Sequence, residues 1–164
     1  MKLIKRVGIL ICITFLMIQF FRPSKNNDTS STAIKNDISN IIAVPASVQV
    51  ILQTSCYDCH SNNSKYPWYA NVQPVAWWLN HHIEEGKHEI NFNEFASYRL
   101  RRQYRKLQEI VEQVKDDEMP MASYTLMHKQ ATLSAEQKNT IIQWAKANMD
   151  SMQLKYPKDS LIKK

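Results

Sequence analysis

The sequence predicts an all-α protein, and three features support that prediction. The 164 residues include only two glycines and six prolines, the residues that most often interrupt helices. Long stretches are rich in Lys, Glu, Gln, Leu and Ala, which favour helices over strands. Apolar residues recur at helical spacing in several of these stretches. A chain of this length, 44% hydrophobic and 22% charged, fits one globular domain with a short appendage.

The first 22 residues have the character of a membrane-targeting segment. Basic residues at positions 2, 5 and 6 open the chain, and fifteen residues without a charge follow, from Val7 to Phe21. That length suits a signal sequence as well as a membrane span, but no small-residue cleavage site follows Phe21. We therefore expect an uncleaved signal anchor or transmembrane segment at 1–22, with a cleaved signal as the alternative. The basic start predicts a single-pass inner-membrane protein whose domain lies in the periplasm.

The remaining chain divides into a linker, a domain and a tail. Polar residues with little apolar periodicity predict a flexible linker at 23–42. The helical periodicities fall within 43–152, the predicted domain, and 153–164 is the predicted C-terminal tail. Removing the four basic residues of the first 22 leaves 17 basic and 15 acidic side chains, a net charge of about +2. That balance does not favour a nucleic-acid partner.

Four helices are expected in this domain, each indicated by apolar residues three and four positions apart. Proline suits a first helical turn, so the first helix follows Pro45 and runs into Cys56. Ser134 opens the last helix, because Gln137 stands in capping-box position behind it. The predicted helices, in chain order, cover 45–56, 75–87, 93–117 and 134 onward, with proline-containing loops at 61–74 and 118–133.

The run Cys56-Tyr57-Asp58-Cys59-His60 is the strongest chemical signal in the chain. Covalent haem attachment needs two thiols spaced to meet the two vinyl groups, and a histidine directly after the second thiol to bind the iron. Cys56, Cys59 and His60 meet these conditions and predict one haem c. The alternatives are a redox-active dithiol, which needs no following histidine, and half of a zinc site, for which the sequence has no second cysteine pair.

Haem iron with a histidine on one side commonly takes a methionine on the other, which raises the reduction potential and favours electron transfer. Met119 is the first candidate for this distal position, because the following proline stiffens the backbone of its loop. Met121 is the main rival. His81, His82 or His128 would instead give a haem with two histidine ligands.

Tyr66 and Trp68 belong to a dense aromatic run soon after the attachment motif. A flat apolar cofactor needs such side chains around it, so both are candidates for the haem pocket, where either could donate a hydrogen bond to a propionate. Core packing without haem contact is the alternative for both.

The residues around these positions resemble the small bacterial haem-binding domain proteins, which are single-haem c-type cytochromes. The likeness covers about residues 50 to 146. It rests on an ordered series of motifs: CYDCHS at 56–61, YPWY at 66–69, Pro74 with Trp77-Trp78, His82-Ile83 with Gly86, Asn91-Phe92, Met119-Pro120 with Tyr124 and His128, Leu133-Ser134, and Trp144-Ala145.

The resemblance implies a cytochrome c-like fold with Cys56 and Cys59 as haem attachments, His60 as proximal ligand and Met119 as distal ligand. A histidine distal ligand stays open, because His82 and His128 belong to the shared pattern. The expected function is single-electron exchange with redox partner proteins outside the cytoplasmic membrane, and not catalysis. The alternative is a peroxidase-like enzyme, or a gas or redox sensor, with a displaceable distal ligand.

Overall fold

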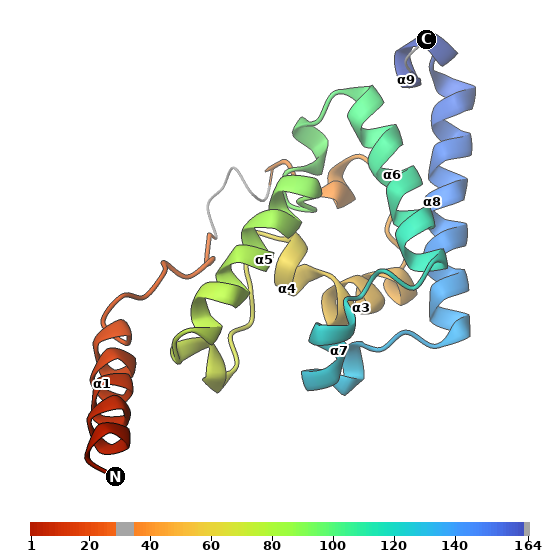
Figure 1. Ribbon diagram of the computed structural model, residues 1–164. Helices are drawn as coiled ribbons and strands as arrows, with labels where there is room; N and C mark the ends of the chain where they lie inside the picture. Colours follow the sequence, from red (N-terminus) through yellow and green to blue (C-terminus); the bar gives the residue numbers. More distant parts are fainter. Residues whose placement is uncertain (29–34, 163–164) are drawn as a thin grey trace.

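The computed structural model describes residues 1–28 and 35–162, so part of the predicted linker (29–34) and the end of the predicted tail (163–164) lie outside the described residues. Within the described residues the regular elements are helices, and an isolated antiparallel bridge joins Asn27 to Asn63 (Figure 1). The all-α prediction is confirmed. In chain order, with η for a 3-10 helix, the elements are α1 (Lys2–Ile18), η1 (Ile38–Asn40), α3 (Ala46–Ser55), α4 (Tyr57–His60), η2 (Trp68–Asn71), α5 (Val75–Glu89), η3 (Phe95–Ser97), α6 (Leu100–Lys115), α7 (Ala122–Met127), η4 (Lys129–Ala131), α8 (Ala135–Lys155) and α9 (Lys158–Leu161).

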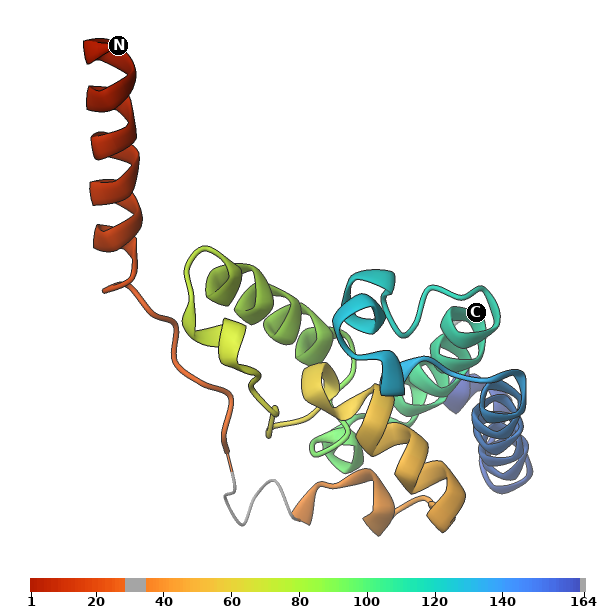
Figure 2. The same ribbon diagram turned by 90° about the horizontal axis from the view of Figure 1, so that it is seen from below.

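The first helix, α1, projects away from the other helices (Figure 2). None of its residues is buried, although most of its side chains are apolar. No helix in the described ranges is both long enough and apolar enough to cross a bilayer.

The core lies where α3, α6 and α8 meet. Leu52 of α3, Leu107 of α6 and Ile141 of α8 are almost completely buried and belong to one apolar cluster. Trp144 of α8 joins the cluster and donates a hydrogen bond from its indole Nε1 to the carbonyl oxygen of Ala43, 3.0 Å away. The hydrogen bond brings the chain before α3 against α8. The apolar cluster holds α3 and α6 beside each other.

Predicted helix boundaries agree with the structure where a proline or a capping box marks them. Three predicted helices are confirmed as α3, α5 and α8, and the Ser134 side chain and the Gln137 side chain form the expected capping box. The third predicted helix begins later than expected, at Leu100. Before it, the Asn91 side chain accepts a hydrogen bond from the backbone N–H of Asn93, which competes with helix formation.

Two segments that the sequence assigns to a linker and a loop contain ordered structure. Ile38 and Ile42, inside the predicted linker, are buried in the core, and the Asp37 side chain caps η1. The predicted loop at 118–133 contains α7 and η4. Short helices of this kind are stabilised by tertiary contacts more than by their own sequence, so periodicity does not reveal them.

Candidate functional site

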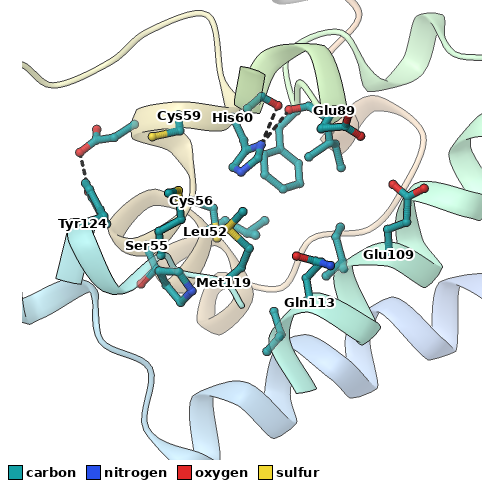
Figure 3. Close-up of a pocket in the computed structure, with 18 of the residues that line it drawn as sticks. Leu52, Ser55, Cys56, Cys59, His60, Glu89, Glu109, Gln113, Met119 and Tyr124 are labelled. Carbon is teal, nitrogen blue, oxygen red and sulfur yellow. Dashed lines mark hydrogen bonds between the residues drawn. The ribbon is translucent and has the colours of Figure 1, made fainter. Parts of the chain in front are cut away.

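A cavity of about 780 Å³ lies between α3, α4, α5, α6 and α7 (Figure 3). This volume falls within the roughly 300–1,000 Å³ typical of small-molecule and cofactor sites. The residues after α3 bring Cys56, Cys59 and His60 to one side of it. Apolar side chains from other elements complete much of the lining, among them Leu52, Ile110, Val114, Leu133 and Ile141. The site therefore places two thiols and an imidazole beside a largely apolar chamber.

His60 is oriented by two backbone carbonyl groups. Its Nδ1 atom lies 2.8 Å from the carbonyl oxygen of Gly86 and 3.1 Å from that of Ile90. Since both partners are acceptors, Nδ1 carries the proton and Nε2 keeps its lone pair. Burial lowers the pKa of His60 although both carbonyls oppose the shift, so the neutral ring is favoured. A neutral imidazole held in this way by its other nitrogen is a typical metal ligand.

Gly86 allows α4 to approach α5 closely. A Cβ atom at this position would lie 2.8 Å from the carbonyl oxygen of Cys59, closer than real Cβ contacts. The short segment after α5 continues the support, because the backbone N–H of Phe92 donates a 2.8 Å hydrogen bond to the carbonyl oxygen of His60. The sequence contains only two glycines, and a glycine within a helical stretch is a signal for such an approach.

Cys56 and Cys59 are free thiols beside the cavity. Burial raises the pKa of Cys56 to about 12, and Cys59 adds to the effect. Burial also raises the pKa of Cys59 to about 11, with the neighbouring Asp58 carboxylate adding to it. Burial therefore favours the protonated form of both thiols, the opposite of the lowered pKa that activates redox-active dithiols.

The predicted distal methionines reach the cavity from the segment between α6 and α7. Met119 and Met121 are both half-buried and both line it. In Figure 3 the Met119 side chain extends into the cavity from the side facing His60. The segment is tied at both ends: the backbone N–H of Met119 donates to the carbonyl oxygen of Gln113, and the Tyr124 hydroxyl donates a 2.7 Å hydrogen bond to Asp58 Oδ2. The structure thus brings the thiols, His60 and Met119 to one chamber.

Comparison with known proteins agrees with this arrangement. The sequence matches the family described as Haem-binding domain over residues 13–147, most of the chain. The chain belongs to that family. No curated protein and no solved structure matches it significantly. Haem binding is therefore shown for this chain at the level of its family, and the cavity beside His60 is the candidate site for the group.

The histidines considered as rival ligands occupy different places in the haem-binding domain. His82 is half-buried and lines the cavity, and its Nδ1 lies 3.4 Å from Glu85. His81 is exposed and points to the same carboxylate. His128 does not line the cavity: its Nε2 lies 2.7 Å from the Tyr69 hydroxyl, and its ring stacks on Tyr124. Of these three histidines, His82 is thus the one that lines the chamber.

The haem-binding domain also has a cation at the cavity whose burial the sequence does not indicate. The side chain of Lys106, on α6, is 3% exposed, and its Nζ lies 2.8 Å from Glu89 and 2.5 Å from Glu109. The bond from Lys106 lowers the pKa of Glu89. Lys106 stands within a run of basic residues typical of a solvated helix face, so the sequence predicts exposure at this position.

Tyr66 and Trp68 do not reach the cavity. Trp68 is 77% exposed, and the Tyr66 hydroxyl accepts a hydrogen bond from the backbone N–H of Asn26. Neither lines the chamber. The structure therefore does not bring these two predicted pocket residues to the haem site, and it gives Tyr66 a different partner in the chain that follows α1.

Proposed function

We propose that the protein is a c-type cytochrome, with one haem held by thioether bonds to Cys56 and Cys59 and with His60 as proximal ligand. The observation that supports this most directly is the state of His60, whose Nδ1 is hydrogen-bonded to two carbonyl oxygens beside the two thiols. This leaves Nε2 as the ligating atom. When bound, haem supplies exchange of single electrons. The surrounding residues hold the ring, exclude water and set the potential.

The surroundings of the two cysteines support attachment over the two alternatives. A redox-active dithiol depends on nearby positive charge that lowers a thiol pKa, whereas here burial raises the pKa of both cysteines. A zinc site would need two more ligands beside them. Among the described residues, no three His, Cys, Asp or Glu side chains gather in a way that could hold a metal ion.

Met119 is the proposed distal ligand, which makes the protein an electron carrier in a cytochrome c-like domain. It lines the cavity on the side facing His60, in a segment secured to α6 and to Asp58. Methionine ligation favours a high potential and a closed coordination sphere, both suited to electron transfer. His128 is engaged by Tyr69, and using it would break that hydrogen bond.

The proposed location is the periplasmic side of the membrane, with α1 as the tether. The exposed apolar side chains of this helix and the basic residues in its first turns support a membrane tether with the haem domain in the periplasm. Redox proteins of the same compartment would then be its partners.

A pyridine haemochrome spectrum of protein made with the export and maturation machinery tests the attachment. We expect a c-type spectrum and one haem per chain after acid–acetone extraction. Cys56→Ala and Cys59→Ala should each retain haem through one thioether and shift the α-band, and Cys12→Ser is the matched control that should not. Haem removed completely by extraction from the natural chain would contradict covalent attachment.

The visible spectrum of paired methionine variants tests the distal ligand. Met119→Ala should lose the thioether-to-iron charge-transfer band near the red edge, and Met121→Ala should keep it, although both side chains line the cavity. The opposite pattern would assign Met121. A high-spin ferric spectrum of the natural protein at neutral pH would favour a peroxidase-like enzyme or a sensor over a carrier.

A further inference from the structure

The chain that leaves α1 is fixed to the domain by paired hydrogen bonds. The Gln73 backbone N–H donates to Gln19 Oε1 at 2.9 Å, and Gln19 Nε2 donates back to the Gln73 carbonyl oxygen at 3.2 Å. The carbonyl oxygen of Phe21 accepts from Gln73 Nε2 at 2.7 Å and from Trp77 Nε1 at 2.8 Å. Gln73 is fully buried by this arrangement. The end of α1 therefore has a defined position against the start of α5.

A second anchor lies a few residues further along. Asn26 is buried, and its Nδ2 donates to the carbonyl oxygen of Ser61 and to Ser64 Oγ, each at 2.8 Å. Its Oδ1 accepts a 2.8 Å hydrogen bond from Lys87 Nζ. These partners directly follow the attachment motif or lie on α5, next to Gly86. The exit of α1 is thus tied to the same elements that hold His60.

Aromatic side chains are exposed at this junction. We call Phe20, Phe21, Trp68, Trp77 and Trp78 the aromatic face; each is at least 41% exposed. They lie on the chain after α1, on η2 and at the start of α5, which the hydrogen bonds above hold together. Exposed large aromatics in one area mark an interaction surface.

The surface continues onto α7. The 2.7 Å contact between the Tyr69 hydroxyl and His128 Nε2 joins η2 to the end of α7, where Leu126 and Met127 are also exposed. In both ribbon views η2, the start of α5 and α7 lie on the side of the domain toward which α1 projects (Figures 1 and 2). The C-terminal end of α8, which carries the exposed Leu154, lies on the far side.

We propose that the aromatic face and the exposed side of α7 rest on the lipid headgroup region of the membrane that holds α1. This rests on the proposed tether and adds an orientation to it. Tryptophan is enriched at this depth of a bilayer, because its ring is apolar and its N–H is polar. Arg22 and Lys25, in the same stretch, suit lipid phosphates. Phe20 and Phe21 of the face follow α1 directly in the chain, so the face adjoins the helix that the proposal places in lipid.

Two helices of the proposed lipid-facing surface also line the cavity. They are α5 and α7, which contribute residues such as His82 and Tyr124. Contact with lipid would therefore hold the cavity at a fixed height above the bilayer. Electron exchange would be restricted to partners that reach that height.

Spin labels on the full-length haem protein in nanodiscs test this orientation. The native Cys12, exposed on α1, reports whether that helix lies in lipid. In a Cys12→Ser background, Leu126→Cys places a label on the proposed face and Leu154→Cys places one on the far side as the matched control. Power saturation with oxygen and with a nickel chelate then measures the depth of each label in phosphatidylcholine–phosphatidylglycerol bilayers.

We expect the label at 126 to be several-fold less accessible to the nickel chelate than the label at 154. We expect it to be more accessible to oxygen than the label at 154. The double variant Phe20→Ser/Trp68→Ser, which changes two exposed side chains, should bring the two labels closer to equal. A label at 12 in lipid with labels at 126 and 154 equally aqueous overturns the proposed orientation and leaves the tether standing. A label at 12 in water overturns both. A label at 126 shielded from both reagents indicates a protein partner and overturns the lipid contact.

Discussion

Replacing Gly86 with alanine tests the packing that orients His60. A Cβ atom there would lie 2.8 Å from the carbonyl oxygen of Cys59 and 3.2 Å from its Cβ atom. Carbon atoms pack best about 3.5–4.0 Å apart, so α4 and α5 must separate by several tenths of an ångström. Overpacking of this kind costs about 1–3 kcal/mol, and alanine recovers about 1 kcal/mol of helix propensity. We expect the variant to be less stable by up to about 2 kcal/mol.

The same separation should weaken the hydrogen bond between His60 Nδ1 and the Gly86 carbonyl. That bond makes the imidazole a stronger electron donor, so weakening it disfavours ferric iron and raises the reduction potential. Urea unfolding followed by circular dichroism, together with a potentiometric titration, measures both effects on the haem-loaded protein. Gly8→Ala is the matched control, because a Cβ on that glycine meets nothing within 4 Å. A Gly86→Ala protein that is about 1 kcal/mol more stable than the natural one, with the same potential, would refute the close approach.

Three further variants test other parts of the site and fold. Tyr124→Phe removes a hydrogen bond to the Asp58 carboxylate that is worth about 1.5 kcal/mol when half-buried. The variant should unfold at a lower temperature and show a weaker thioether-to-iron charge-transfer band. No change in either would show that this bond does not hold α7. Lys106 lowers the pKa of Glu89 below 4.5, so this pair contributes stability that is lost as pH falls below about 4.5. Denaturant unfolding at a series of pH values should therefore show that Lys106→Met loses less stability on acidification than the natural protein does. Ser134→Ala removes the cap of α8 and should cost about 1 kcal/mol in denaturant unfolding, whereas Ser134→Thr should cost less.

Local chemistry explains what could be predicted from the sequence. The attachment motif depends on the spacing of neighbouring residues, and the capping box of α8 depends on two side chains three positions apart. The family match agrees with the resemblance that these motifs indicate. The approach of α4 to Gly86 and the burial of Lys106 depend instead on contacts between distant segments. α7 falls in the same class, because its Tyr124 is held by Asp58 from another helix.

The tryptophans show where sequence alone is insufficient. An aromatic run after the attachment motif fits a haem pocket and a surface equally well, since both need large apolar rings. What separates them is the direction of the side chains, which the paired bonds of Gln73 and Gln19 determine by holding η2 and the start of α5 against the end of α1. Trp77 Nε1 donates to the carbonyl oxygen of Phe21, which holds the indole ring beside the end of α1 and outside the cavity. The cavity lining includes Phe92 and Tyr124 but no tryptophan, and Trp68, Trp77 and Trp78 are exposed at the surface instead.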